Sequence, residues 1–403
     1  MKIGLASLYL LASINIASAN LLEDDDFGLA EETFDAPVEE RWYDKLKLTL
    51  EHSQTVTNVG TTHQRSSLRG LYENQLGESG YVYIDGRYQY LWHNDYLIAQ
   101  DPSKDGGEWE ERLTQAWVQY SYGRCAAKVG KQHVFWGEVE GAFVTDVISP
   151  FDYTEQLLTD FATIRRAQSL ALADCYIDDH RWQVFYNPKA YFDRFPIVQF
   201  SSASLGAEYG VNYEYSFSGG DVSLMVAHLY PNAPSLVSVS NTEIIAEPYT
   251  LIGLGSSIAS GRLLYKFDLA FKDRQHVNFV SQPTKRIDVA LGIEYTTPDN
   301  HFFNAGVWGR YELDDIESET SESPILTLGW SKAYWHDNLA MSLLGNYADE
   351  PSYTSLTLQA DYQWNDYISF LIALGWASLP EEAEFLPIAQ QERSGSYSVK
   401  VEF

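Results

Sequence analysis

The chain has 403 residues, a formal net charge of −29 and 14% aromatic residues. Its acidic balance argues against nucleic-acid binding, which needs a basic face to neutralise phosphates, and no long cluster of Lys and Arg is present. The mean hydropathy of −0.27 is that of a soluble protein. It does not exclude a membrane barrel, because barrel strands place only every second side chain in lipid.

Residues 1–19 have the three parts of a secretory signal peptide. Lys2 supplies the positive charge, residues 3–16 form an apolar stretch, and 17–19 read as an A-x-A cleavage site. The apolar stretch is too short to span a membrane comfortably. We therefore expect an exported protein whose mature chain begins at Asn20.

Residues 20–44 are acidic and show neither the strand period nor the helix period. We expect a solvated periplasmic leader there. The alternative is a short periplasmic plug or a partner-binding arm. This division leaves residues 45–403 for one folded unit.

From about residue 45, segments of roughly ten residues alternate apolar and polar side chains, which is the period of strands with two different faces. The alternation is clearest over 205–217, 263–272, 287–295 and 356–364. Strands of soluble sandwiches are usually shorter, about five or six residues. Aromatic residues gather at the segment ends, as in the girdles of membrane barrels. The pattern predicts an all-β fold, a transmembrane antiparallel β-barrel.

Short and long connections take turns along the chain, as short periplasmic turns and longer external loops do in such barrels. Counting segments gives about 18 strands, with 16 as the alternative. The long connections are expected near 56–64, 93–108, 137–168, 188–203, 231–247, 273–284, 312–324 and 378–391.

The last segment, 395–403, alternates and ends in Phe403. Such a strand resembles the signal that the barrel-assembly machinery of the outer membrane reads. Because every backbone polar group must be paired in lipid, the first strand, near 46–50, should pair with the last. We expect a Gram-negative outer-membrane protein surrounded by lipids, with a homo-oligomer as one option.

The most distinctive motif reads G-[RK]-Q-x-x-x-W-G-E over 130–138, then D-x-I-x-P-x-D over 146–152. Over residues 125–176 the chain resembles a family of Gram-negative outer-membrane proteins known only as a domain of unknown function. The resemblance implies an outer-membrane barrel working with envelope machinery that moves hydrophobic molecules. It implies no enzyme.

The longest connection, 137–168, follows directly on the motif and holds several aromatic residues, so we expect it to be folded. One hypothesis is that it enters the barrel and narrows it, with its acids facing inward-pointing bases. The alternative is a packed outer lid whose charges pair locally. The candidate constriction residues are Glu138, Glu140, Asp146, Asp152, Arg165, Arg166, Arg87, Arg181 and Arg310.

Alternation places many charges on the inner face, which either make a hydrated, cation-preferring pore or simply pair with one another, since barrel interiors are polar. These inward positions are Asp85, Arg87, Lys128, Glu208, Glu214, Lys266, Asp268, Asp288, Glu294, Arg310 and Asp361.

The two cysteines of the chain, Cys125 and Cys175, fall beside successive periplasmic turns at the ends of neighbouring strands. Those positions adjoin in an antiparallel hairpin, and export exposes them to an oxidising compartment. We predict a disulfide between them, with two free thiols as the alternative.

Neither a nucleophile elbow nor a zinc-binding H-E-x-x-H nor a phosphate loop is present, and the nine histidines are scattered. We therefore predict no catalytic residues, no metal and no cofactor. The leading hypothesis is a porin-like channel for small hydrophilic solutes. The alternative is a conduit or docking barrel for lipid-like molecules, working with an envelope transport system.

Overall fold

The computed structural model describes residues 45–58, 60–95, 107–154, 164–195, 200–238, 243–278, 280, 282–314, 324–349, 352–378 and 393–403. The expected signal peptide and leader, 1–44, lie outside these ranges. The described residues form one sheet of 18 antiparallel strands and a separate two-stranded hairpin. Among them, no helix is both long and apolar enough to cross a membrane.

The first half of the barrel is built from nine strands, which precede the separate hairpin. These strands are β1 (Leu46–Thr57), β2 (Gly60–Leu76), β3 (Gly80–Asn94), β4 (Glu108–Tyr122), β5 (Cys125–Gln132), β6 (Gln168–Ile177), β7 (His180–Asn187), β8 (Glu208–Phe217) and, ninth, β9 (Gly220–Leu229), with a 3-10 turn at Ser202–Ser204.

The second half follows the small hairpin, which is made of β10 (Ser235–Ser238) and β11 (Glu243–Ile245). Its strands are β12 (Tyr249–Ser260), β13 (Leu263–Gln275), β14 (Thr284–Thr296), β15 (Phe302–Glu312), β16 (Ile325–Tyr334), β17 (Leu339–Ala348), β18 (Tyr353–Asn365), β19 (Ile368–Ser378) and β20 (Arg393–Glu402). The predicted strand number of 18 is therefore confirmed.

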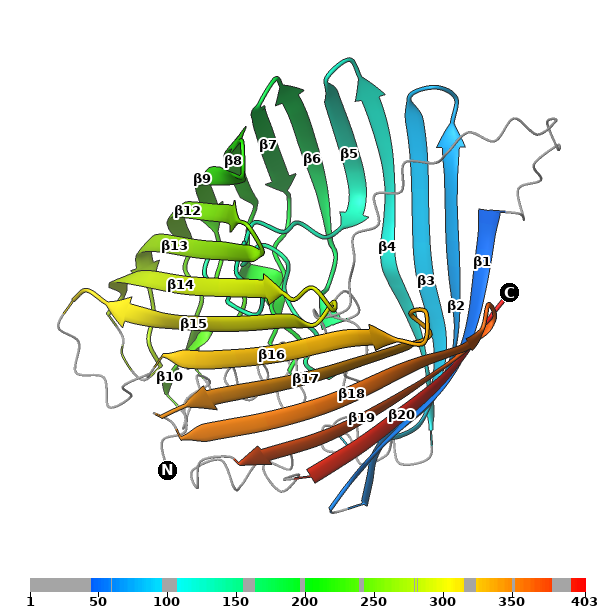
Figure 1. The fold of residues 1–403 in the computed structure, drawn as a ribbon. Helices are drawn as coiled ribbons and strands as arrows, with labels where there is room; N and C mark the ends of the chain where they lie inside the picture. The colour runs from blue at the N-terminus through cyan, green and yellow to red at the C-terminus, as the bar shows by residue number, and fades with distance from the viewer. Residues whose placement is uncertain are drawn as a thin grey trace.

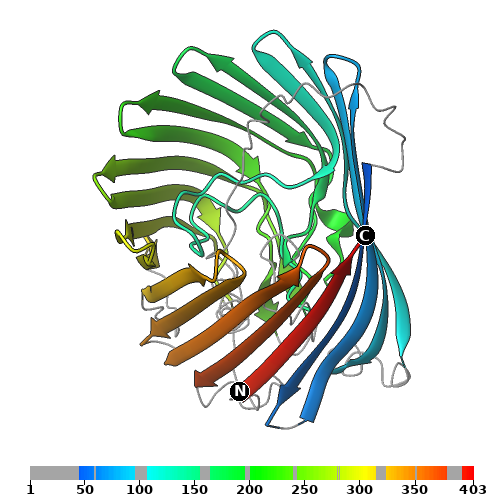
Figure 2. The ribbon, with the colours of Figure 1, turned by 45° about the vertical axis from the view of Figure 1, so that its right-hand side comes forward.

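The sheet closes on itself. Strand β1 pairs with β2 on one side and with β20 on the other, from Thr49 opposite Glu402 to Thr57 opposite Ser394. Phe403 continues the seam, because its N–H donates to the carbonyl of Leu48 at 2.9 Å. Figure 2 shows the red end of β20 beside the blue β1. Closure removes the edges that a sheet cannot leave unpaired in lipid.

The outer surface is apolar, as the alternation predicted. Ile252, Leu291 and Ile372 project outward from three strands and are each more than half exposed. Aromatic residues that are 60% exposed or more lie near the strand ends, namely Trp109, Tyr122, Trp335, Trp364, Tyr367 and Phe403. An apolar belt with aromatic margins is the outer face of a membrane barrel.

The tight turns that join β4 to β5 and β6 to β7 lie side by side at one end of the barrel, as Figure 1 shows. The same end holds the start of β1 and the end of β20. One expectation was wrong: 56–64 is not a long loop. Strand β1 continues to Thr57 and β2 begins at Gly60, because Thr55, Thr57 and His63 are polar residues of the inner face.

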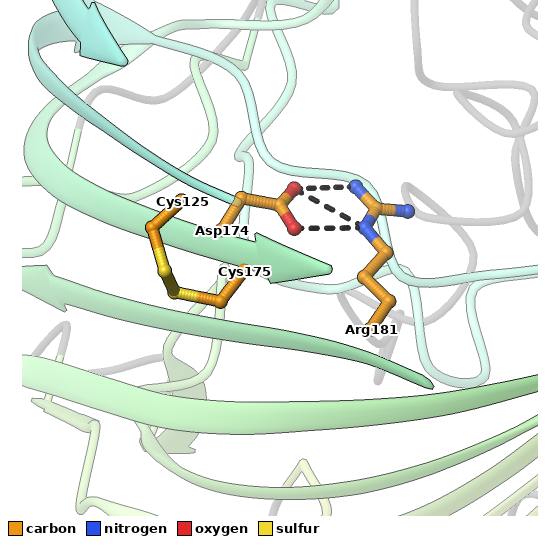
Figure 3. The surroundings of a disulfide bond; sticks show 4 residues. All are labelled: Cys125, Asp174, Cys175 and Arg181. Carbon is orange, nitrogen blue, oxygen red and sulfur yellow. Dashed lines mark hydrogen bonds and ion pairs between the residues drawn. A yellow bond between two sulfur atoms is a disulfide. The ribbon is translucent and has the colours of Figure 1, made fainter. Parts of the chain in front are cut away.

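Cys125 and Cys175 form the predicted disulfide (Figure 3). They are direct partners on β5 and β6, with Cα atoms 4.1 Å apart. Both lie next to tight turns, so the bond braces the two strands that carry the longest connection. On the inner face beside it, the guanidinium of Arg181 donates to Asp174 at 2.7 Å.

Candidate functional site

The connection between β5 and β6, residues 133–167, enters the barrel rather than capping it. It is the teal segment that crosses the interior in Figure 2. Residues 155–163, which include Phe161, lie outside the described ranges. The described parts contact inward-facing residues of β7, β8, β9 and β12 to β15. The sequence-based hypothesis of an inward-folded connection therefore agrees with this placement.

Trp136 fixes the start of the connection against β7 and β8. Its indole N–H donates to the side-chain oxygen of Gln183 at 2.5 Å. Its ring meets Phe185 edge to face, with centroids 5.2 Å apart. Gly210 on β8 makes room for it, because a Cβ there would lie 2.9 Å from the indole. The tryptophan of the motif is thus an anchor within the barrel.

Asp268 on β13 holds the turn that follows. Its carboxylate accepts the backbone N–H of Glu138 at 3.0 Å and of Val139 at 2.8 Å, and the hydroxyl of Thr145 at 3.1 Å. The side chain of Asp268 is fully buried. Gly141, with φ +74°, lets the chain reverse direction between the two contact points.

The wall beneath this turn consists of glycines. A Cβ on Gly253 would lie 3.1 Å from Thr145, and one on Gly292 would lie 3.3 Å from Val139. Glycines inside strands often mark places where another backbone comes close. Their positions on β12 and β14 therefore permit the contact between the turn and the wall.

An apolar cluster fills the space between the connection and the wall. Phe143 packs edge to face on Phe151 at 5.0 Å and on Trp308 of β15 at 6.1 Å. Val144 and Ile148 are buried in the same cluster. Burying one such side chain contributes roughly 1.5–3 kcal/mol, so the cluster stabilises the docked connection.

Arg165 and Asp146 form an ion pair inside the connection. The guanidinium of Arg165 also lies 4.7 Å from the ring centres of Phe135 and Phe151. Gln168 donates to the carbonyl of Ile148 at 2.6 Å and accepts from Asn187. The second half of the motif thus joins the two ends of the connection.

Asp152 links the connection to the opposite side of the mouth. It lies 3.3 Å from Arg194 of the β7–β8 connection and 3.2 Å from Arg112 of β4. Arg194 also binds Glu110 at 2.9 Å. The predicted Asp152 therefore has partners that the sequence did not indicate.

The remaining candidates are dispersed. Glu140 pairs with Lys266 at 3.5 Å. Arg166 donates to the carbonyl of Phe192, and Arg181 binds Asp174 near the tight-turn end, not the connection. Arg310 stacks on Trp308 at 5.1 Å. The sequence predicted that the acids of the connection face Arg87, Arg181 and Arg310; for Arg181 this is wrong, because its partners are Asp174 and Glu214.

Arg87, the last candidate, belongs to a cluster of bases and acids on the inner faces of β1 to β4. Arg69 makes two bonds to Asp85 at 2.9 Å, and Arg65 lies 3.5 Å from Glu51. Sequence reasoning missed Arg65 and Arg69 because a long connection was expected over 56–64, so the alternation was not followed into this strand. Following the alternation from Thr61 onward places the side chains of Arg65 and Arg69 on the inner face.

Glu138 has an unusual electrostatic setting. Burial raises the pKa of its carboxyl to about 7, and the nearby carboxylates of Asp221, Asp268 and Glu214 add to this effect. His133, at the start of the connection, has its pKa lowered to about 3 by burial and by Arg165 and Lys131. The connection thus carries an acid that titrates near neutral pH.

A cavity of about 150 Å³ lies between the connection and the loops at the mouth. Phe143, Phe151 and Tyr153 line one side of it, and Lys272 and Arg274 line another. Among the described residues, no group of three His, Cys, Asp or Glu could hold a metal ion.

Comparison with known proteins identifies the fold. Over 89% of its length the chain is similar to OpdK of Pseudomonas aeruginosa, solved with vanillate, with a TM-score of 0.58, 7% identity and 98% of that chain covered. It is similarly related to OccAB3 of Acinetobacter baumannii, with a TM-score of 0.56, 9% identity and 98% of that chain covered. For OccAB1 of the same species the TM-score is 0.56, the identity is 9% and 95% of that chain is covered.

No protein-family model matches the sequence, and no curated protein matches it. The likeness to the solved structures therefore shows the fold. It is a closed, 18-stranded porin-like barrel of the kind found in the outer membrane of Gram-negative bacteria.

Proposed function

We propose that this protein is an outer-membrane channel through which small hydrophilic solutes diffuse, and that the 133–167 connection narrows it. The observation that carries the proposal is the bonding of the turn at Glu138 and Val139 to Asp268, on the inner wall. A segment held there reduces the cross-section of the channel without blocking it.

The width of the barrel supports this function. Barrels of 16 to 18 strands are wide enough to contain an aqueous channel. The connection covers one side, while charged side chains of β1 to β4, Arg69 and Asp85 among them, stand on another. Charged groups beside a narrow passage select solutes by their charge.

The similar structures support the proposal at the level of the fold. One of them, OpdK, was solved with vanillate, a small organic acid. We propose that solutes of comparable size are the cargo of the present barrel.

A conduit for lipid-like molecules is the second candidate, and the apolar cluster inside the barrel favours it. The cavity beside that cluster measures about 150 Å³. Sites for drug-sized ligands usually occupy about 300–1,000 Å³, so this cavity is small for a lipid chain. We therefore prefer the channel.

Planar-bilayer recording of the purified protein tests the proposal. We expect steps of about nanosiemens size for an open porin-like pore. Replacing residues 139–163 by a short Gly-Ser linker should raise the conductance, because the narrowing segment is removed. The matched control replaces 313–323, another long external connection. Silence of the intact protein would contradict the channel, and unchanged conductance of the 139–163 variant would contradict the narrowing.

A further inference from the structure

Asp268 is a buried carboxylate that serves the 133–167 connection and no base. Within the part of the chain that the structure describes, every hydrogen bond that it accepts comes from that connection, through Glu138, Val139 and Thr145. No salt bridge within the described ranges reaches it. By contrast Asp288, on the next strand, pairs with Lys272 and Arg286.

The free energy of burying the Asp268 carboxylate depends on whether the connection is docked. A carboxylate without a base is costly to bury, and donors aimed at it offset that cost. When the connection is docked, three donors converge on Asp268. When it is undocked, the same carboxylate would face the lumen and be hydrated. Asp268 therefore stabilises the docked position of the connection and contributes little to the pairing of the strands.

The wall around Asp268 leaves room for this segment. Gly255 is the direct partner of Asp268 on β12, and Ala290 is its partner on β14. A Cβ on Gly255 would lie 3.2 Å from Glu138. The backbone can reach the carboxylate because the residues around it are small.

We propose that Asp268, together with the glycines Gly253, Gly255 and Gly292, forms a seat that positions the turn at 138–145 and thereby sets the largest solute that the channel admits. The effect on solute size rests on the proposed function. The positioning of the turn does not, and it can be measured without conduction.

The first experiment compares D268N with D361N. The amide keeps the shape of Asp268 but turns an –NH₂ group toward the donors, so the turn should leave the wall. D361N removes the same charge from the inner face of β18, away from the connection. We expect D268N to raise conductance by about twofold and to admit larger sugars in liposome swelling, with D361N unchanged. Equal behaviour of the two variants would overturn the proposal.

The second experiment measures docking directly, with V139C and G306C combined in a C125S/C175S background. A Cβ on Gly306 would lie 3.9 Å from Val139, an ordinary contact that tolerates the substitution. We expect a disulfide to form under mild oxidation, and to form about tenfold more slowly when D268N is added, which corresponds to about 1.4 kcal/mol of lost docking. Equal rates would refute the seat.

The crosslink also provides a rescue. Oxidation of the triple variant V139C/G306C/D268N should restore the small conductance and the original size limit, and reduction should reverse both. Heat-dependent mobility on a gel shows that each variant is folded. Crosslinking as expected, in a protein that conducts nothing, would overturn the channel and support the seat.

Discussion

The two halves of the inner wall have the same strand geometry but different side chains. Across β12 to β15 one row reads Gly255, Asp268, Ala290 and Trp308, and the 133–167 connection lies on it. Across β17 to β1 a comparable row reads Ser342, Gln359, Ala373, Ser396 and Thr55.

The second wall contains hydrogen bonds between its own side chains, in this row and in the rows beside it. Thr55 and Ser396 share a hydrogen bond of 2.9 Å, and Asn346 donates to Ser355 at 3.2 Å. The first row contains a carboxylate whose bonds come from outside the wall. This difference indicates that the inward-facing side chains, and not the barrel fold, determine which wall the connection binds.

The largest effect concerns the disulfide, which joins β5 and β6, the two strands that carry the connection, and neither of the two rows compared above. Its cysteines are 50 residues apart in sequence. In the chain-entropy model a closed loop of this length contributes about 4 kcal/mol. The C125S/C175S variant should therefore unfold at a lower temperature on gels, while its conductance stays the same. A conductance change with unchanged stability would show that the bond acts on the pore.

The second-largest effect is expected from placing a valine on each of the two walls. G253V places a Cβ 3.1 Å from Thr145. Overpacking of this kind typically costs about 1–3 kcal/mol, so the turn should be displaced and the conductance should rise. The control is S355V, on the other wall. If S355V opened the channel as much as G253V, the two halves would not differ as described.

The smallest effect depends on pH and on Glu138. Its pKa lies near 7 with the turn docked, against 4.5 for an ordinary Glu, so the protonated form favours docking. This stabilisation is complete below about pH 4.5 and is lost as the pH rises through about 7. Conductance should therefore be higher, or noisier, at about pH 8 than at about pH 5. E138Q should remove the dependence, and an unchanged dependence would assign it to another group.

Much of the fold could be predicted from the sequence because the information is local. Alternation over 205–217 and 287–295 indicated strands, and the positions of Cys125 and Cys175 beside tight turns indicated their bond. The full lengths of β1 and β2 were missed because polar inner-face residues such as His63 resemble a loop when the alternation around them is weak.

The site was harder to predict because its contacts are distant in sequence. The motif indicated which segment is special, and Asp268 was correctly placed on the inner face. Nothing local connects Asp268 to Glu138, which is 130 residues away. Arg194 lies in a connection without alternation, so its contact with Asp152 gave no signal.

The seam between β1 and β20 has a consequence for protein engineering. Leu48 and Phe403 are hydrogen-bonded neighbours, so a short peptide linker could join Phe403 to the start of β1. New ends could then be opened at another tight turn, such as 218–219 between β8 and β9. A circularly permuted barrel of this kind would keep every strand pair, and its termini would carry tags on the same rim.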